Sequence, residues 1–187
     1  HLAILAARRR GVLFDIGHGR GSFDFEVARQ ALANKFPPDT ISTDLQRGHE
    51  DQSPPHSLLS VVSKLVAVGM DRRLALRSVS ERPAAWLDRD DVAGTIQAGR
   101  VADLAVLRWS EQPSTLTDTS GQLLEAAVLT VEQTWRAGQL ASEIDALKPS
   151  VRTDITTSVK MTSANIASVR PVLNLELMGY ATAVTRT

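Results

Sequence analysis

Two short segments decide the expected fold: Val12-Leu-Phe-Asp-Ile-Gly-His-Gly19 and Thr40-Ile-Ser-Thr-Asp44. Each is a short apolar or β-branched run that ends in polar residues, a pattern typical of buried parallel strands. Between them, residues from about Asp24 to Asn34 carry apolar side chains at helical spacing. This strand–helix–strand order predicts a parallel pair whose carboxyl ends lie at the same edge of a sheet.

The chain continues with the same alternation and then changes character. Three further helices are expected, over Ser57 to Val68, Asp71 to Ser80 and a short stretch around Pro83 to Leu87. After about Asp90 the sequence becomes β-rich, with expected strands over Ala102–Leu107 and Ala126–Trp135, a polar loop over Ser110–Gly121, and a hairpin turn at Arg136-Ala-Gly-Gln139. We therefore expect an α/β part over residues 1–90, a small β segment over 91–141 and an irregular tail over 142–187.

Composition excludes several classes of function. Lys plus Arg and Asp plus Glu are equal at 21 each, and aromatic residues make up only 4% of the 187 residues. A neutral chain gives no electrostatic basis for binding nucleic acid or an anionic membrane. No apolar run approaches the roughly 20 residues that span a bilayer, and no secretory signal is evident, so a cytoplasmic location is expected. Because cysteine is absent, any metal must be held by histidine and carboxylate.

His18 and Asp44 are the candidate site residues, because each follows an expected strand. Residues just past the carboxyl ends of parallel β/α strands face the active-site mouth, and the glycines around His18 let the backbone pass close to a ligand or metal. Ordinary structural roles remain open for both residues. His18 could be a hydrogen-bonding loop residue, and Asp44 could cap the next loop or helix. Asp15 is expected to hold a backbone amide or His18. His49 and His56 lie in a polar loop and are expected to be solvent-exposed.

Four motifs stand in order and with plausible spacing in the stretch from about Gly11 to about Leu140. They are Gly11-Val-Leu-Phe-Asp-Ile-Gly-His-Gly-Arg-Gly-Ser-Phe23, Pro38-Asp-Thr-Ile-Ser-Thr-Asp44, Ser63-Lys-Leu-Val-Ala-Val-Gly-Met70 and Gly94-Thr-Ile-Gln-Ala-Gly-Arg-Val-Ala-Asp-Leu104. Together they resemble the amidohydrolase/deacetylase branch of the amidohydrolase superfamily, whose members are similar to dihydroorotases and D-aminoacylases. The first two are fairly specific to the branch, and the last is specific only to the superfamily.

The resemblance implies a fold class: α/β, comprising the C-terminal part of a TIM-type metallo-hydrolase barrel plus a small β-sandwich segment. The strand ending at His18 would be the seventh of the barrel and the strand ending at Asp44 the eighth. Residues 1–90 would then be the barrel part, residues 91–141 the β-sandwich segment, and residues 142–187 a tail of unknown role.

The resemblance also implies roles and chemistry. Asp44 would be a metal ligand and the catalytic general base, and His18 would bind substrate or the developing oxyanion. The implied reaction is hydrolysis of non-peptide carbon–nitrogen bonds or acyl esters by metal-activated water, with a binuclear zinc site in the parent enzyme. The implied partner is a small-molecule amide or acyl substrate, with neither nucleic acid nor membrane involved, and a homo-oligomer is a further expectation for the full-length parent.

Departures from the family pattern lead to the rival interpretations. The His-x-His pair of the first strand, the bridging carboxylated lysine and the histidines of the fifth and sixth strands have no counterpart, and Lys64 belongs to the helix after the eighth strand. The chain begins with His1 rather than Met, so we expect a fragment that does not retain the zinc site by itself. The main alternative is a catalytically inactive truncated remnant. A phosphate-binding loop at Gly17–Gly21 is a weaker alternative, since it lacks the Lys-Ser/Thr of a P-loop.

Overall fold

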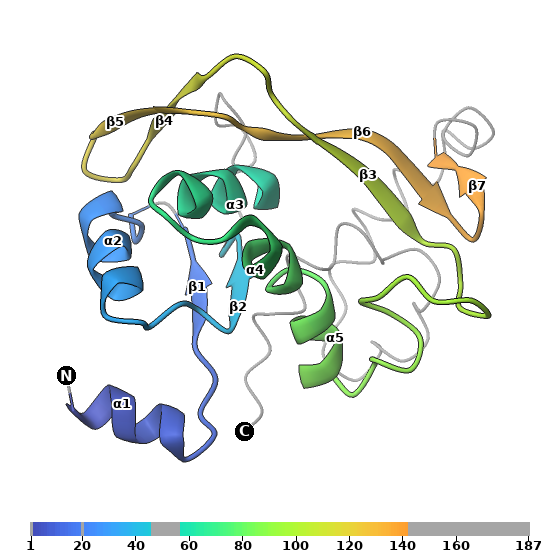
Figure 1. Ribbon diagram of the computed structural model, residues 1–187, viewed down its shortest axis with the longest axis horizontal. Helices are drawn as coiled ribbons and strands as arrows, with labels where there is room; N and C mark the ends of the chain where they lie inside the picture. Colours follow the sequence, from blue (N-terminus) through green and yellow to red (C-terminus); the bar gives the residue numbers. More distant parts are fainter. Residues whose placement is uncertain (1, 20, 46–56, 142–187) are drawn as a thin grey trace.

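The computed structural model describes residues 2–19, 21–45 and 57–141. The helices are α1 (Leu2–Arg9), α2 (Phe25–Ala33), α3 (Leu58–Ala67), α4 (Arg72–Arg77) and α5 (Glu81–Trp86). The strands are β1 (Asp15–Gly17), β2 (Thr40–Ser42), β3 (Leu104–Trp109), β4 (Ser114–Thr117), β5 (Leu123–Ala126), β6 (Leu129–Arg136) and β7 (Gln139–Leu140). The two parallel strands lie beside α2 and α3, and the long β3–β6 ribbon passes over α3 (Figure 1). The predicted tail, residues 142–187, lies outside the described residues.

The predicted parallel pair is confirmed. β1 and β2 run parallel, with Ile16 opposite Ile41 and Gly17 opposite Ser42. β1 is shorter than predicted, because it begins at Asp15 rather than Val12 and leaves Val12 46% exposed. Of the described strands only β2 pairs with β1, so the segment before Asp15 has little that buries it.

Asp15 has a different role from the one predicted. Its carboxylate holds neither a backbone amide nor His18, but accepts hydrogen bonds from the hydroxyls of Thr40 at 2.7 Å and Ser42 at 2.5 Å. Thr40 and Ser42 are both buried. Asp15 therefore joins β1 to β2 through side chains in addition to the backbone pairing.

Local capping chemistry explains where the helices begin and end. Asp24 accepts a hydrogen bond from the Val27 amide at 2.9 Å and starts α2, and Ser57 forms a capping box with Ser60 at the start of α3. After α3, Gly69 adopts a φ of +110° and its amide donates to the Val66 carbonyl. Glycine adopts this left-handed conformation readily, and for that reason it commonly ends helices.

The β segment contains two strands that were not predicted, β4 and β5. The polar loop expected over Ser110–Gly121 includes β4, which pairs antiparallel with β5. β4 buries Leu116 alone and exposes Ser114, Thr115 and Thr117, so its composition resembles a loop. The predicted hairpin turn is confirmed: Ala137 and Gly138 both have positive φ, as a type I′ turn between β6 and β7 requires.

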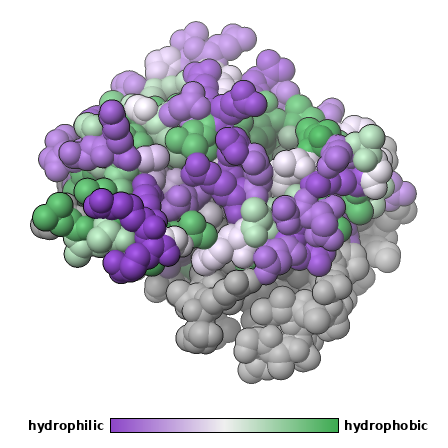
Figure 2. Space-filling view, turned by 60° about the horizontal axis from the view of Figure 1, so that its bottom comes forward, coloured by the Kyte–Doolittle hydropathy of each residue, from purple (hydrophilic) through white to green (hydrophobic). Residues whose placement is uncertain are grey.

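One core serves both parts of the described chain. The fully buried side chains of Phe23, Phe25, Ile41 and Leu65 pack in the same cluster as Leu116 and Leu129 of the β segment. A polar contact crosses the same boundary, since the Leu129 amide donates to the Ser63 hydroxyl at 2.8 Å. On the outer surface, apolar and hydrophilic side chains are interspersed over the described part of the face shown in Figure 2. None of the described helices is long and apolar enough to cross a membrane.

The Ser63–Leu129 contact gives a test of this coupling. We expect Ser63→Ala to lower the free energy of unfolding by about 1–3 kcal/mol, because it leaves the buried Leu129 amide without its acceptor. Denaturant unfolding followed by circular dichroism measures the change. Ser114→Ala, on the exposed face of β4, is the control and should leave stability within about 0.5 kcal/mol. Equal effects of the two substitutions would contradict a structural role for this contact.

Candidate functional site

The two predicted site residues lie at the same edge of the parallel pair. His18 directly follows β1, and Asp44 stands two residues after the end of β2. A hydrogen bond from the Gly19 amide to the Thr43 carbonyl, 3.0 Å long, joins the two segments just beyond the strands. The prediction that His18 and Asp44 follow adjacent parallel strands at the same end is therefore confirmed.

Asp44 is exposed and lies against the turn that contains His18. A Cβ atom added at Gly17 would be 2.9 Å from the Asp44 Cβ, and one added at Gly19 would be 2.8 Å from the Asp44 Oδ2. Glycine is therefore required at both positions if Asp44 is to stay where it is. The sequence predicted that these glycines allow a close approach, and the group that approaches is the Asp44 side chain.

His18 is buried, and both of its ring nitrogens contact other parts of the chain. Its Nδ1 lies 2.8 Å from the Gly19 carbonyl oxygen, and its Nε2 lies 2.6 Å from the Lys64 Nζ. Because a carbonyl only accepts hydrogen bonds, Nδ1 carries the proton and Nε2 accepts from Lys64. The ring also stacks on Phe23, with centroids 5.1 Å apart and planes 5° from parallel.

Lys64 is a buried residue of the site that the sequence analysis did not identify. It projects from α3 and is only 8% exposed, with Nζ 5.9 Å from the centre of the Phe23 ring. Burial lowers the pKa of Lys64, and the negative charge of Asp118 acts in the opposite direction. A signal was present: Lys64 interrupts the buried apolar run of Val61, Val62 and Leu65 on α3, and a lysine there needs a partner.

Asp118 is a second buried charged residue that the sequence analysis did not single out. Its carboxylate accepts hydrogen bonds from the backbone amides of Phe25, Ser120 and Gln122 and from the Ser120 hydroxyl. Burial acts to raise the pKa of Asp118, but these hydrogen bonds lower it below its usual value. Because its oxygens are occupied in this way, Asp118 fastens the β4–β5 turn to the start of α2.

The described residues supply too few groups for a metal site of their own. In residues 2–19, 21–45 and 57–141, no three histidine or carboxylate side chains come together as metal ligands would. Asp44, an exposed oxygen donor at the strand ends, is the group there that suits a divalent cation. His49 and His56 lie outside the described residues.

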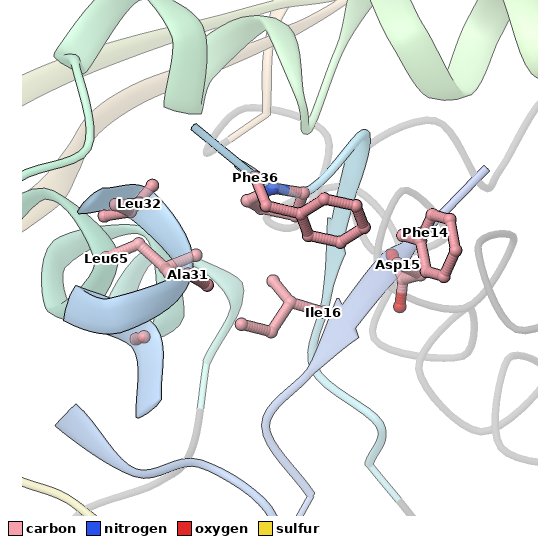
Figure 3. A pocket seen from close by; sticks show the side chains of 9 residues that line it. Phe14, Asp15, Ile16, Ala31, Leu32, Phe36 and Leu65 are labelled. Atoms are coloured by element: carbon pink, nitrogen blue, oxygen red, sulfur yellow. The ribbon is translucent and has the colours of Figure 1, made fainter. Parts of the chain in front are cut away.

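An apolar pocket of about 180 Å³ opens elsewhere, on the flank of β1. Figure 3 shows the side chains of Phe14, Ile16, Leu32 and Phe36 around it. Its one carboxylate, that of Asp15, is already bound to the two hydroxyls of β2. Neither His18, Asp44 nor Lys64 lines this pocket, so it is separate from the candidate site.

Comparisons with known proteins agree with the motifs. No family model matches the sequence. A deacetylase of Enterococcus faecalis is 36% identical over 115 residues, which cover 62% of this chain and 31% of that protein. A deacetylase of Agrobacterium fabrum is 35% identical over 113 residues, which cover 60% of this chain and 27% of that protein.

Two solved structures of enzymes are also similar to the chain. It superposes on an adenine deaminase with a TM-score of 0.67 and 33% identity, covering 73% of this chain and 37% of that one. A dihydroorotase gives a TM-score of 0.63 and 28% identity, covering 74% and 38%. The chain is related to deacetylases of the amidohydrolase superfamily. The resemblance predicted from the motifs is thus confirmed. The chain spans about three tenths of the length of the curated relatives it matches.

The contact between the His18 turn and Asp44 leads to a mutational test. We expect Gly17→Ala to displace Asp44 and to cost about 1–3 kcal/mol of stability, because the new Cβ has no room beside the Asp44 Cβ. Gly21→Ala is the matched control, since a Cβ there meets nothing within 4 Å. Backbone amide shifts of Asp44, together with denaturant unfolding, measure both effects. Equal changes in stability and in the Asp44 amide shift for the two alanine variants would contradict the close approach of Gly17 to Asp44.

Proposed function

We propose that the chain supplies the last two strand–helix units of a TIM-type barrel and part of the β-sandwich of a metal-dependent amidohydrolase. The parallel pair β1–β2, in which each strand is followed by a helix, supports the barrel part over residues 1–90. The antiparallel strands β3 to β7 support the β segment over 91–141. The reaction would be hydrolysis of a small amide or acyl ester, as in the deacetylase relatives.

One observation carries this proposal: Asp44 presents an exposed carboxylate at the carboxyl end of β2, and two glycines make room for it. A carboxylate in that position can accept the proton of an attacking water and return it to the leaving nitrogen or oxygen. We therefore assign Asp44 as the general base. The same oxygen atoms suit it as one ligand of a divalent metal.

His18 is proposed as a residue beside the substrate. In the described structure its Nδ1 and Nε2 contact Gly19 and Lys64, so a direct hydrogen bond to substrate requires one of these partners to exchange. Burial of the ring against Phe23 favours a supporting role over a direct contact.

The metal proposed for the whole protein is zinc. A bound zinc ion would lower the pKa of a water molecule toward neutrality. Zinc sites use about three or four protein ligands, and the described residues fit only the Asp44 share of such a site. The remaining ligands would come from outside the described residues.

A chimera tests the role of Asp44. The segment of the Enterococcus faecalis deacetylase that aligns with this chain is replaced by the matching part of this sequence. We expect the chimera to retain deacetylase activity, and Asp44→Asn to lower its kcat by about 10²–10⁴-fold, the usual contribution of a general acid–base group. Steady-state kinetics on an acetylated substrate of the parent enzyme provide the measurement.

Asp24→Asn is the matched control in that chimera. Asparagine caps a helix as well as aspartate does, so this variant should keep the activity of the unsubstituted chimera. Full activity after Asp44→Asn would remove Asp44 from the proposed mechanism. A folded chimera without any activity would instead favour the alternative of a catalytically inactive remnant.

The metal proposal gives a separate expectation for the 187-residue chain by itself. We expect it to bind less than one zinc per chain after dialysis and to hydrolyse neither an N-acyl amino acid nor a cyclic ureide. The reason is that Asp44 alone is too small a ligand set. Metal analysis by mass spectrometry decides the point: one tightly bound zinc per chain that is lost on Asp44→Ala would contradict it.

A further inference from the structure

We infer that Lys64 is a positioning residue of the candidate site: it fixes the His18 ring, and through that ring it holds the Gly17–Gly19 turn beside Asp44. This inference rests on the proposed function for its catalytic consequence. The contacts that support it run from the buried face of α3 to the edge of the sheet.

The first contact anchors the ring to a rigid element. Lys64 reaches His18 from α3, whose neighbouring residues Val61, Val62 and Leu65 are at most 1% exposed. α3 packs against both β2 and β6, so it has support on two sides. Because Lys64 is itself buried, its Nζ has little freedom to leave the 2.6 Å contact with Nε2.

The second set of contacts carries this anchoring to Asp44. The His18 Nδ1 donates to the Gly19 carbonyl at 2.8 Å, so the ring closes over its own turn. The Gly19 amide in turn donates to the carbonyl of Thr43, the residue just before Asp44. The turn is therefore held from α3 on one side and from the end of β2 on the other, with the Asp44 carboxylate against it.

The Gly19 carbonyl and Lys64 together also set the tautomer and the charge of His18. The Gly19 carbonyl requires a proton on Nδ1, and the Lys64 donor requires a lone pair on Nε2. Histidine in water favours the opposite, Nε2-protonated tautomer. Two cations at this separation would repel one another strongly, so His18 is neutral whenever Lys64 carries its proton. A lysine that merely filled space in the core would impose neither condition.

Histidine tautomers can be read directly by nuclear magnetic resonance of the full 187-residue chain labelled with ¹⁵N-histidine. The His18 signals are assigned by their loss in His18→Asn. In the unsubstituted protein we expect His18 to be neutral, with the proton on Nδ1. In Lys64→Met, which keeps the apolar stem and removes the donor, we expect loss of that tautomer and shifted amide signals of Gly19 and Asp44.

Lys35→Met is the matched control, because Lys35 is exposed at the end of α2 and should affect none of these signals. In the deacetylase chimera, Lys64→Met should lower kcat by about 10–100-fold with little change in KM, the usual cost of losing a supporting group. Lys35→Met should leave kcat unchanged there.

Two results would overturn the inference. One is an Nε2-protonated His18 in the unsubstituted protein, a measurement that needs no variant to fold. The other is a folded Lys64→Met protein in which the His18 tautomer and the Asp44 amide are unchanged. Neither result depends on activity, so failure of the proposed function, seen as an Asp44→Asn chimera with full activity, is distinguishable from failure of this inference.

Discussion

The absence of side chains at Gly17 and Gly19 is the constraint on which the candidate site depends. The Asp44 side chain occupies the space that a Cβ at either position would fill. The contact is possible only in one register of β1 against β2, and Asp15 reinforces that register by binding the hydroxyls of Thr40 and Ser42. A slip of one residue would turn both hydroxyls to the other face of the pair and break both hydrogen bonds.

The sequence predicted the features that depend on local chemistry. The bounds of α2 and α3 and the hairpin turn at Ala137-Gly138 follow from residue types within a few positions of one another. The parallel pair follows from the strand–helix–strand order. β4 was missed because its Leu116 is the one buried residue in a strand of Ser and Thr. The role of Lys64 was missed because its partner His18 is 46 positions away in the chain. A lysine within the apolar run of α3 signals that a partner is needed, but it does not identify that partner.

The β segment supports the site as well as the core. Phe23, which stacks on His18, has its carbonyl bound by both the amide and the hydroxyl of Thr119 in the β4–β5 turn. Asp118, one position earlier, binds the amide of Phe25. The turn that carries His18 is thus held from two directions, by Lys64 on α3 and by the β4–β5 turn. Substitutions in the β segment that are remote from Asp44 can therefore act on the site through Phe23.

The backbone of Asp44 sets it apart from the other strained positions. Four non-glycine residues in the described ranges have positive φ: Lys35, Asp44, Asp88 and Ala137. Lys35 and Asp88 end helices, each donating its amide back to the last turn, and Ala137 belongs to a hairpin. Asp44, with a φ of +50°, follows a strand and performs neither task. A left-handed residue of this kind costs about 1–3 kcal/mol and is typically found at functional sites. We interpret this conformation as serving the position of the Asp44 carboxylate, because the adjacent glycines accommodate that side chain.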